Sequence, residues 1–424
     1  MKKSLLALAV AGAFVAPGIA SATNVSMWGW LNPSVASSSA SSSESTGNSI
    51  VAAGVAGTAT PSHISTHPNV SLIGISGEED LGNGLKATMR AETGFGIDGT
   101  DYGASTPGLY TRESKVGLAG SWGEVFIGNW HSPLKALGYG HHNNFGSVLL
   151  DVFGEANNAT EKALLSMPGA FANSFSGTVD GSDGATSFSQ TPSFDSRLGR
   201  ALAFWSPVIN DNLSFQVHFS PNGARSNAAT FNDPSVLAAN VIFDNGTLGV
   251  GAAWEQRKDL AGLNTLTGST DGTSSTDRAY RLALGFKLGA TAVNFKFENI
   301  SYKVDGVTSS ELNEYDRDAW SFGASHSWDA HSVRGRYSKA SAGGCTIGDG
   351  SACSTADAGA QEMAFGYTYT LSKRTQLVVN WIKVDNEANA QYGFGGYGND
   401  SGMAGTDGPG QTAKSLTFGV QHGF

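Results

Sequence analysis

Two groups of residues in this sequence have types that could support ligand chemistry. Residues 94–99 read GFGIDG and match G-x-G-x-x-G, a pattern that cradles a dinucleotide when a helix follows it. No helical pattern follows this segment, so we interpret it as the start of a loop. His131, His141 and His142 could bind a metal ion, but no carboxylate or cysteine stands at ligand spacing from them. We therefore expect no metal site and no cofactor.

The two cysteines, Cys345 and Cys353, lie eight positions apart in AGGCTIGDGSACSTAD. In an oxidising compartment such a pair can close a small loop as a disulfide. A zinc site would need two further ligands, and none lies nearby in the sequence. Two free thiols are the alternative. We predict a disulfide that staples a loop and has no catalytic role.

The sequence begins with the pattern of an export signal. The first 22 residues, MKKSLLALAVAGAFVAPGIASA, contain two lysines, an apolar run, and small residues at Ala20 and Ala22. This is the pattern of a secretory signal peptide with an A-x-A cleavage site. The apolar run is too short for a membrane-spanning helix, which needs about 20 residues. We predict that residues 1–22 are removed on export through the general secretory pathway and that residues 23–424 form the mature chain.

Composition narrows the class of protein. Glycine accounts for 56 of the 424 residues and charged residues for 15%, which favours many strands and turns. The formal net charge of −10 argues against nucleic acid as a partner. No later segment has 18 consecutive apolar residues, which excludes a helical membrane protein.

Strand-like alternation recurs along the rest of the chain. In LSFQVHF (213–219), NFKFENI (294–300) and EMAFGYTYT (362–370), apolar residues alternate with small or polar ones. Short connections, such as DNG (244–246), alternate with long segments, of which 131–196 is the longest. Seven short turns and eight long loops predict sixteen strands.

Short turns on one side and long loops on the other are typical of an outer-membrane barrel. In lipid, the backbone groups of a sheet are all paired only when the sheet closes on itself. At sixteen strands the side chains no longer fill the interior, so an aqueous channel remains. We predict an all-β fold, a 16-stranded antiparallel transmembrane β-barrel, with the serine-rich segment 34–49 as a solvated outer loop. A soluble exported β-sandwich is the alternative.

Three segments carry a resemblance to a known family. They are SLIGISGEEDLGNGLKATMRAETGF (71–95), YTRESKVGLAGSWGEVFIGNWHSP (110–133) and FGVQHGF (418–424). The chain resembles the trimeric general porins of Gram-negative bacteria, of the beta- and gamma-proteobacterial type. The resemblance implies a homotrimer in the cell outer membrane, in which ions and small hydrophilic solutes diffuse passively through each barrel. It also implies a long third loop, here 131–196, folded into the pore as a constriction.

The resemblance further implies that acidic loop side chains face basic wall side chains across a narrow wet pore, which filters solutes by size and charge. The acidic candidates are Asp151, Glu155 and Glu161. The basic candidates, on or next to inward rows of strands, are Lys86, Arg90, Arg112, Lys115, Arg334 and Arg336. Each of these residues could instead be a rim charge without effect on selectivity.

The sequence departs from the family at several basic positions. Phe126, Asn129, Gln421 and Gly423 stand where relatives usually carry basic residues. We therefore expect fewer basic residues along the inner wall than in relatives, and the net charge of the chain is negative. We predict a weakly selective pore that leans toward cations.

Two other functions stay open as alternatives. A substrate-specific outer-membrane channel would use Trp28, Phe126 and Trp205 as an inward aromatic track. An outer-membrane enzyme such as a phospholipase would need a distinctively placed nucleophile, and the sequence has no Gly-x-Ser-x-Gly motif. We predict a channel and no enzymatic activity.

The segment SLTFGVQHGF (415–424) predicts a strand with Leu416, Phe418 and Val420 on its outward row. Phe424 falls on the same row. The resemblance implies that this phenylalanine is the signal read by the barrel-assembly machinery. Outer-membrane lipid and lipopolysaccharide are the other partners implied.

Overall fold

A computed structural model describes most of the chain. The described residues are 24–67, 71–95, 112–139, 149, 164–165, 194, 197–221, 235–259, 274–310, 312–393 and 408–424. The predicted signal peptide and the three acidic candidates Asp151, Glu155 and Glu161 lie outside these ranges. Among the described residues, no helix is long and apolar enough to cross a membrane.

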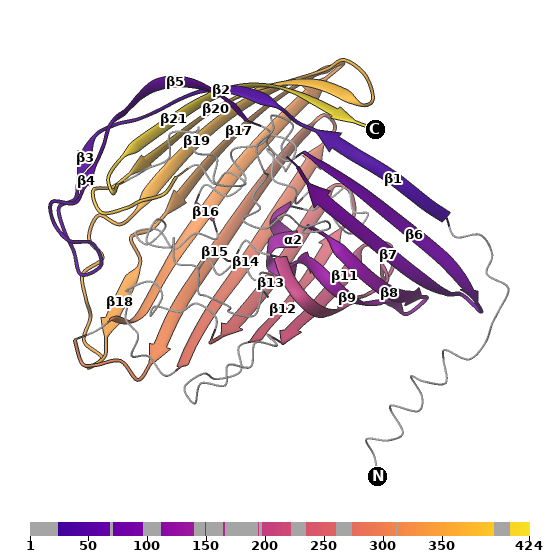
Figure 1. Ribbon diagram of the computed structural model, residues 1–424, viewed down its shortest axis with the longest axis horizontal. Helices are drawn as coiled ribbons and strands as arrows, with labels where there is room; N and C mark the ends of the chain where they lie inside the picture. Colours follow the sequence, from indigo (N-terminus) through magenta and orange to yellow (C-terminus); the bar gives the residue numbers. More distant parts are fainter. Residues whose placement is uncertain are drawn as a thin grey trace, which may run out of the picture.

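Strands make up nearly all of the described structure (Figure 1). They are β1 Asn24–Leu31, β2 Ser34–Ala40, β3 Ser43–Glu44, β4 Ala56–Gly57, β5 Thr60–His67, β6 Leu72–Gly82, β7 Leu85–Gly94, β8 Ser114–Gly120, β9 Gly123–His131, β10 Arg197–Trp205, β11 Leu213–Pro221, β12 Ser235–Asp244, β13 Leu248–Lys258, β14 Ser274–Leu288, β15 Thr291–Asp305, β16 Leu312–Trp328, β17 His331–Ala340, β18 Gly344–Ile347, β19 Ala360–Thr370, β20 Thr375–Asn386 and β21 Thr412–Gly423. One short helix, α2 Pro133–Tyr139, follows β9.

These strands form sixteen antiparallel passes of one closed barrel in the part of the chain that the structure describes. β1 and β2 together make the first pass, interrupted at Asn32 and Pro33, and β5 and β6 make the second. The last strand, β21, pairs with β20 on one side and with β1 and β2 on the other, which closes the ring. The short strands β3, β4 and β18 belong to loops. The predicted 16-stranded antiparallel barrel is confirmed.

The predicted alternation sets the two faces of the wall. In β11, Phe215, Val217 and Phe219 are exposed on the outer face, whereas Gln216 and His218 are buried on the inner face. Successive side chains of a strand point to opposite faces, so this sequence pattern gives an apolar outer band and a polar inner wall. The same division holds in β21, where Lys414, Leu416, Phe418, Val420 and His422 are exposed on the outer face.

The short connections are tight turns with left-handed residues. Asn83 and Gly84 join β6 to β7 with φ of 54° and 77°. Gly246, between β12 and β13, has φ of 82°. The backbone N–H of Gly246 donates a hydrogen bond to Asp244 Oδ1 at 2.8 Å. Glycine and asparagine tolerate this conformation, as two-residue hairpins require.

The interpretation of residues 34–49 as a solvated outer loop is wrong for its first half. Residues 34–40 are strand β2, paired with β21 and β5. Ala36, Ser38 and Ala40 are buried on the inner face. Small side chains keep the strand period of two even where the composition is low in complexity, and pairing on both edges satisfies the backbone.

Candidate pore lining and constriction

The segment that follows β9 enters the barrel interior at helix α2 (Figure 1). Ser132 caps the helix, because its hydroxyl accepts a hydrogen bond from the backbone N–H of Lys135 at 3.1 Å. Leu134 and Leu137 are buried in one cluster with Ile242 and Ala283 of the inner wall. These contacts lie on the inward rows of β12 and β14, so α2 packs against the lumen side of the sheet.

Three contacts fix α2 to the wall. Asn240 Nδ2 of β12 donates to the carbonyl of Pro133 at 2.9 Å, and Arg281 Nη1 of β14 donates to the carbonyl of Leu134 at 2.9 Å. Leu137 lies over Gly251 of β13, where an added Cβ would overlap the leucine side chain. A side chain at 251 would therefore displace the helix.

Other described residues of segment 132–196 also contact inward-facing side chains. The ring of Phe194 lies 5.7 Å from that of Tyr302 and beneath the Arg257 guanidinium, at 4.5 Å from its Cζ. Leu164 is buried in a cluster with Ala319 and Ile382 on the inner faces of β16 and β20. The rest of the segment lies outside the described residues, so its constriction of the pore stays a prediction.

The basic candidates Arg90 and Arg112 come together on the inner wall at β7 and β8. Arg112 Nε donates to Glu92 at 2.5 Å, and Arg90 Nη2 lies 3.1 Å from the same carboxylate. Glu113 lies 3.6 Å from Arg90 and 3.2 Å from Arg197. Arg112 is buried, whereas the Arg90 side chain keeps 26% of its surface exposed. Of this group, Arg90 is therefore the most exposed cation.

Lys115 belongs to the same wall but is enclosed. Its ammonium lies 2.6 Å from Glu124 and 4.2 Å, 4.8 Å and 5.1 Å from the ring centroids of Trp205, Phe126 and Trp130. Only 10% of the Lys115 side chain is exposed. Aromatic faces and a carboxylate both stabilise an ammonium, so this lysine is held as a paired charge inside an aromatic cage.

A guanidinium–indole contact extends the aromatic group toward the first strand. Arg90 Cζ lies 4.4 Å from the ring centroid of Trp28 and 5.5 Å from that of Trp130. Trp28 and Trp205 thus face inward, as the aromatic-track alternative requires. Tyr369 is exposed on the outer face instead.

The remaining basic candidates lie apart from this group. Lys86 pairs with Glu78 at 3.0 Å, and both side chains are exposed beside the short turn at Asn83. Arg334 and Arg336 lie on the inward row of β17. Arg336 Nη2 lies 2.7 Å from Glu362, and Arg334 donates to Thr368 and Asn380 at 2.7 Å and 2.9 Å.

A second set of inward cations was missed in the sequence. Arg281 Nη2 lies 2.5 Å from Glu298, and Arg317 Nη2 lies 3.9 Å from the same carboxylate. Arg257 Nε lies 2.8 Å from Glu255. The signal was present, because Arg281 alternates with the apolar residues Tyr280 and Leu282 of β14. The described inner wall therefore carries arginines on β13, β14, β16 and β17, several of them paired with glutamate.

A profile of the Gram-negative porin family matches residues 6–389. The chain belongs to this family. It is therefore located in the outer membrane of a Gram-negative bacterium, and family membership points to a channel rather than an enzyme.

Individual relatives agree with this assignment. Over 145 residues the porin is 34% identical to the major outer membrane protein P.IB of Neisseria meningitidis serogroup B. That match covers 32% of this chain and 36% of the relative, about a third of the relative's length. Among solved structures, an anion-selective porin from Comamonas acidovorans superposes with a TM-score of 0.63 at 19% identity, covering 95% of this chain and 100% of that chain. OmpT of Vibrio cholerae in its trimer form gives 0.58 at 12% identity, with coverages of 95% and 100%.

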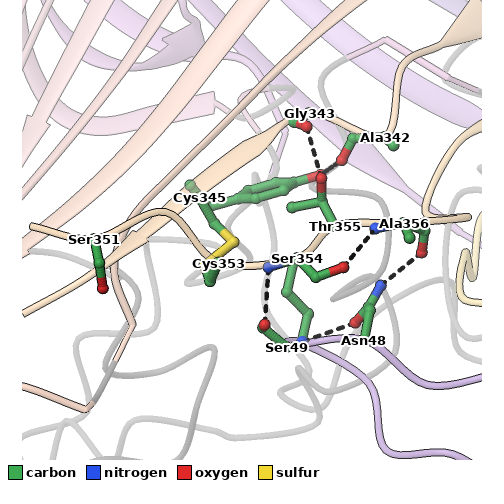
Figure 2. The surroundings of a disulfide bond; sticks show 12 residues. Asn48, Ser49, Ala342, Gly343, Cys345, Ser351, Cys353, Ser354, Thr355 and Ala356 are labelled. Carbon is green, nitrogen blue, oxygen red and sulfur yellow. Dashed lines mark hydrogen bonds between the residues drawn. A yellow bond between two sulfur atoms is a disulfide. The ribbon is translucent and has the colours of Figure 1, made fainter.

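At the rim of this porin, Cys345 and Cys353 form a disulfide (Figure 2). Cys345 lies in β18 opposite Tyr315 of β16. The turn between the cysteines is held by Asp349, which accepts hydrogen bonds from the hydroxyl and backbone N–H of Ser351. These bonds lower the pKa of the Asp349 carboxyl.

The porin presents no group of three or more histidine, cysteine or acidic side chains arranged to hold a metal ion among its described residues. His131, one of the three histidines singled out in the sequence, lies 3.0 Å from Glu113 within the basic group of the wall. His141 and His142 lie outside the described residues.

Proposed function

We propose that this protein is a passive diffusion channel for ions and small hydrophilic solutes, filtered by size and charge. The proposal is supported above all by a closed barrel whose inner face carries arginine–glutamate pairs while its outer face is apolar. A polar, charged inner face opposite an apolar outer face is the pattern of a barrel that encloses an aqueous channel.

Planar-bilayer recording tests the proposal. The purified protein should insert in discrete steps, with a conductance that rises in proportion to salt concentration. Liposomes containing it should swell in small neutral sugars and not in large ones. Membranes that stay tight with correctly folded protein would contradict the proposal.

The charge filter follows from how the wall charges are paired. We infer that Asp151, Glu155 and Glu161 of the loop face Arg90 and its neighbours, with Arg334 and Arg336 contributing from another sector. The described wall cations are largely matched by carboxylates, as in Arg281 with Glu298 and Arg336 with Glu362. Wall cations that are mostly paired, together with acidic loop residues, support a weakly selective pore that leans toward cations. A clear anion preference in a salt gradient would contradict this.

A substrate-specific channel is the second candidate, because Trp28, Trp130 and Trp205 line one stretch of wall together with Arg90. Aromatic faces next to a guanidinium suit solutes that combine a ring with an acidic group. Single-channel current in the presence of such a solute separates the two functions. Concentration-dependent block supports specific binding, and unblocked current supports a general pore.

We further propose a homotrimer that associates through the outer face of β1, β2 and β5–β8. In the described residues the strands of this sector present no aromatic side chain of their own outward, although the Phe424 ring covers Gly29. Ser37 and Ser62 bond to each other at 3.0 Å on its outer surface. β11 to β21 instead present Phe215, Phe295 and Phe418 outward. Small and hydroxylated side chains in a membrane favour protein–protein packing over lipid contact. The trimer form recorded for the structurally similar OmpT of Vibrio cholerae also supports this.

The aromatic sector would face lipid, and the barrel ends would meet charged headgroups. Lys303, Lys339 and Lys414 are exposed on outward rows next to the long loops. These ammonium groups suit the phosphates of lipopolysaccharide. For insertion, we propose that Phe424 is the signal that the barrel-assembly machinery reads.

A further inference from the structure

Three loops of the barrel meet at one buried side chain on the long-loop side. Asn389 follows β20, and its side-chain Nδ2 donates to Thr46 Oγ1 at 3.1 Å and to the carbonyl of Ala356 at 2.9 Å. Its Oδ1 accepts the backbone N–H of Gly47 at 2.9 Å. Asn389 is fully buried. One amide therefore ties together the loops after β2, β17 and β20.

The loops after β2 and β17 also bind each other directly (Figure 2). The backbone N–H of Ser49 donates to the carbonyl of Ser354 at 3.0 Å, and the N–H of Ser354 donates to Ser49 Oγ at 2.8 Å. Asn48 Nδ2 donates to the carbonyl of Ala356 at 2.9 Å. Three strands, β19 to β21, lie between β2 and β17 around the wall, so these contacts join two loops that are not neighbours on the rim.

The disulfide helps to fix the carbonyl groups of Ser354 and Ala356, which accept hydrogen bonds from the loop after β2. The backbone N–H of Cys353 donates to the carbonyl of Cys345 at 3.0 Å, and Cys345 is paired with Tyr315 in the wall. Ser354 follows the bonded cysteine immediately. The cross-link removes most alternative conformations of the segment between Cys345 and Cys353, so Ser354 and Ala356 are held in position for the loop after β2.

This assembly lies on the inner side of the barrel mouth. Ile50 and Cys353 pack against a cluster that contains Tyr302, Val304 and Tyr315, all on inward rows of β15 and β16. Leu134 and Leu137 of α2 belong to the same cluster. The loop contacts are therefore continuous with the packing of α2 inside the lumen.

We propose that residues 45–50, 353–357 and 387–390 form a fixed shelf that sets the size limit of the extracellular mouth, with the Cys345–Cys353 disulfide and Asn389 as positioning residues. The inference rests on the proposed channel function. Long loops of such barrels face the extracellular side, so the shelf is the first constriction that an entering solute meets.

Swelling of liposomes in neutral sugars of graded size tests the shelf. The Cys345→Ser/Cys353→Ser double variant and Asn389→Ala should each admit larger sugars, with a roughly twofold faster swelling in the largest sugar that wild-type protein admits. The smallest sugar should enter at an unchanged rate. Ser274→Ala is the matched control, because it removes a rim hydrogen bond to Asp259 at 2.8 Å away from the shelf.

A reductant gives an independent readout on the wild-type protein. Dithiothreitol is oxidised to its cyclic disulfide while the Cys345–Cys353 bond accepts two electrons and two protons to give two thiols. Alkylation and mass measurement verify the reduction, and the double variant must not respond. Heat-modifiable gel mobility reports that each variant is folded.

The outcomes separate the two proposals. Folded variants and reduced wild-type protein that keep the wild-type size limit would overturn the shelf and leave the channel function intact. Wild-type liposomes that do not swell at all would overturn the channel function itself. A raised limit in both shelf variants, with the Ser274→Ala control unchanged, supports the shelf.

Discussion

Phe424 and Gly29 form a hydrogen-bonded pair across the closing seam of the barrel. The backbone N–H of Gly29 donates to the carbonyl of Phe424 at 3.2 Å, and the N–H of Phe424 donates back at 3.1 Å. The phenylalanine ring covers Gly29, where an added Cβ would overlap it. Because Gly29 has no side chain, the first strand leaves space for the ring of Phe424. Phe424 itself stays 44% exposed on the outer face.

Placing a side chain at the seam should impair closure. We expect Gly29→Ala to displace the Phe424 ring and to cost about 1 kcal/mol of barrel stability, because overpacking forces neighbouring groups to move. The yield of heat-resistant barrel should fall. Gly335→Ala is the control, since a Cβ there makes only ordinary contacts at 3.6 Å.

Removal of the ring in Phe424→Ala should likewise lower the yield of assembled barrel, while the conductance of assembled pores stays unchanged. Normal assembly with altered conductance would refute the proposed signal role.

Loss of the anchor between α2 and the wall should widen the pore. Arg281→Gln removes the ion pair with Glu298 and weakens the hydrogen bond to Leu134. We expect a larger and noisier single-channel conductance, because the segment after β9 loses a fixed contact. Arg278→Gln makes the same replacement on the outer face of β14, where Arg278 bonds Gln256. If both variants conduct like the wild type, α2 does not limit the pore.

Replacement of Lys115 and replacement of its partner Glu124 should shift the ion selectivity in opposite directions. Glu124→Gln leaves the Lys115 charge unmatched and should favour anions, whereas Lys115→Gln leaves Glu124 unmatched and should favour cations. We expect the cation-to-anion permeability ratio to change about twofold in each direction. Reversal potentials in a salt gradient measure it, with the outward-facing Lys383→Gln as control. Identical ratios in both variants would show that the cage lies outside the path of the ions.

The proposed association face predicts where a bulky side chain is tolerated. Ile64 is exposed on the outer face of β5, and Leu284 is exposed on the outer face of β14. We expect Ile64→Trp to lower the trimer fraction at least severalfold, because the larger ring would overpack a close contact between protein surfaces. Leu284→Trp should leave it unchanged, since that sector would face lipid. Native gel electrophoresis in mild detergent compares the two variants, and equal trimer fractions would place the contact elsewhere.

The strand period made much of this architecture readable from the sequence. Alternation in β11 and β21 identified the outward and inward rows, and connection lengths gave sixteen passes and the bounds of the segment after β9. The same rule placed Arg90, Arg334 and Arg336 on the inner wall. It failed at residues 34–40, where serine-rich composition was given more weight than the alternation that β2 follows.

The amino-acid order by itself determined which face each strand residue occupies, because side chains alternate whatever the neighbouring strands are. Only the tertiary structure decided which side chains meet. Lys115 is enclosed by residues of β9 and β10, and Asn389 joins three loops far apart in the chain. Such contacts depend on strand register and loop packing, and neither follows from a local pattern. The net charge of the chain likewise gave no sign that most of the described wall arginines are already paired with glutamate.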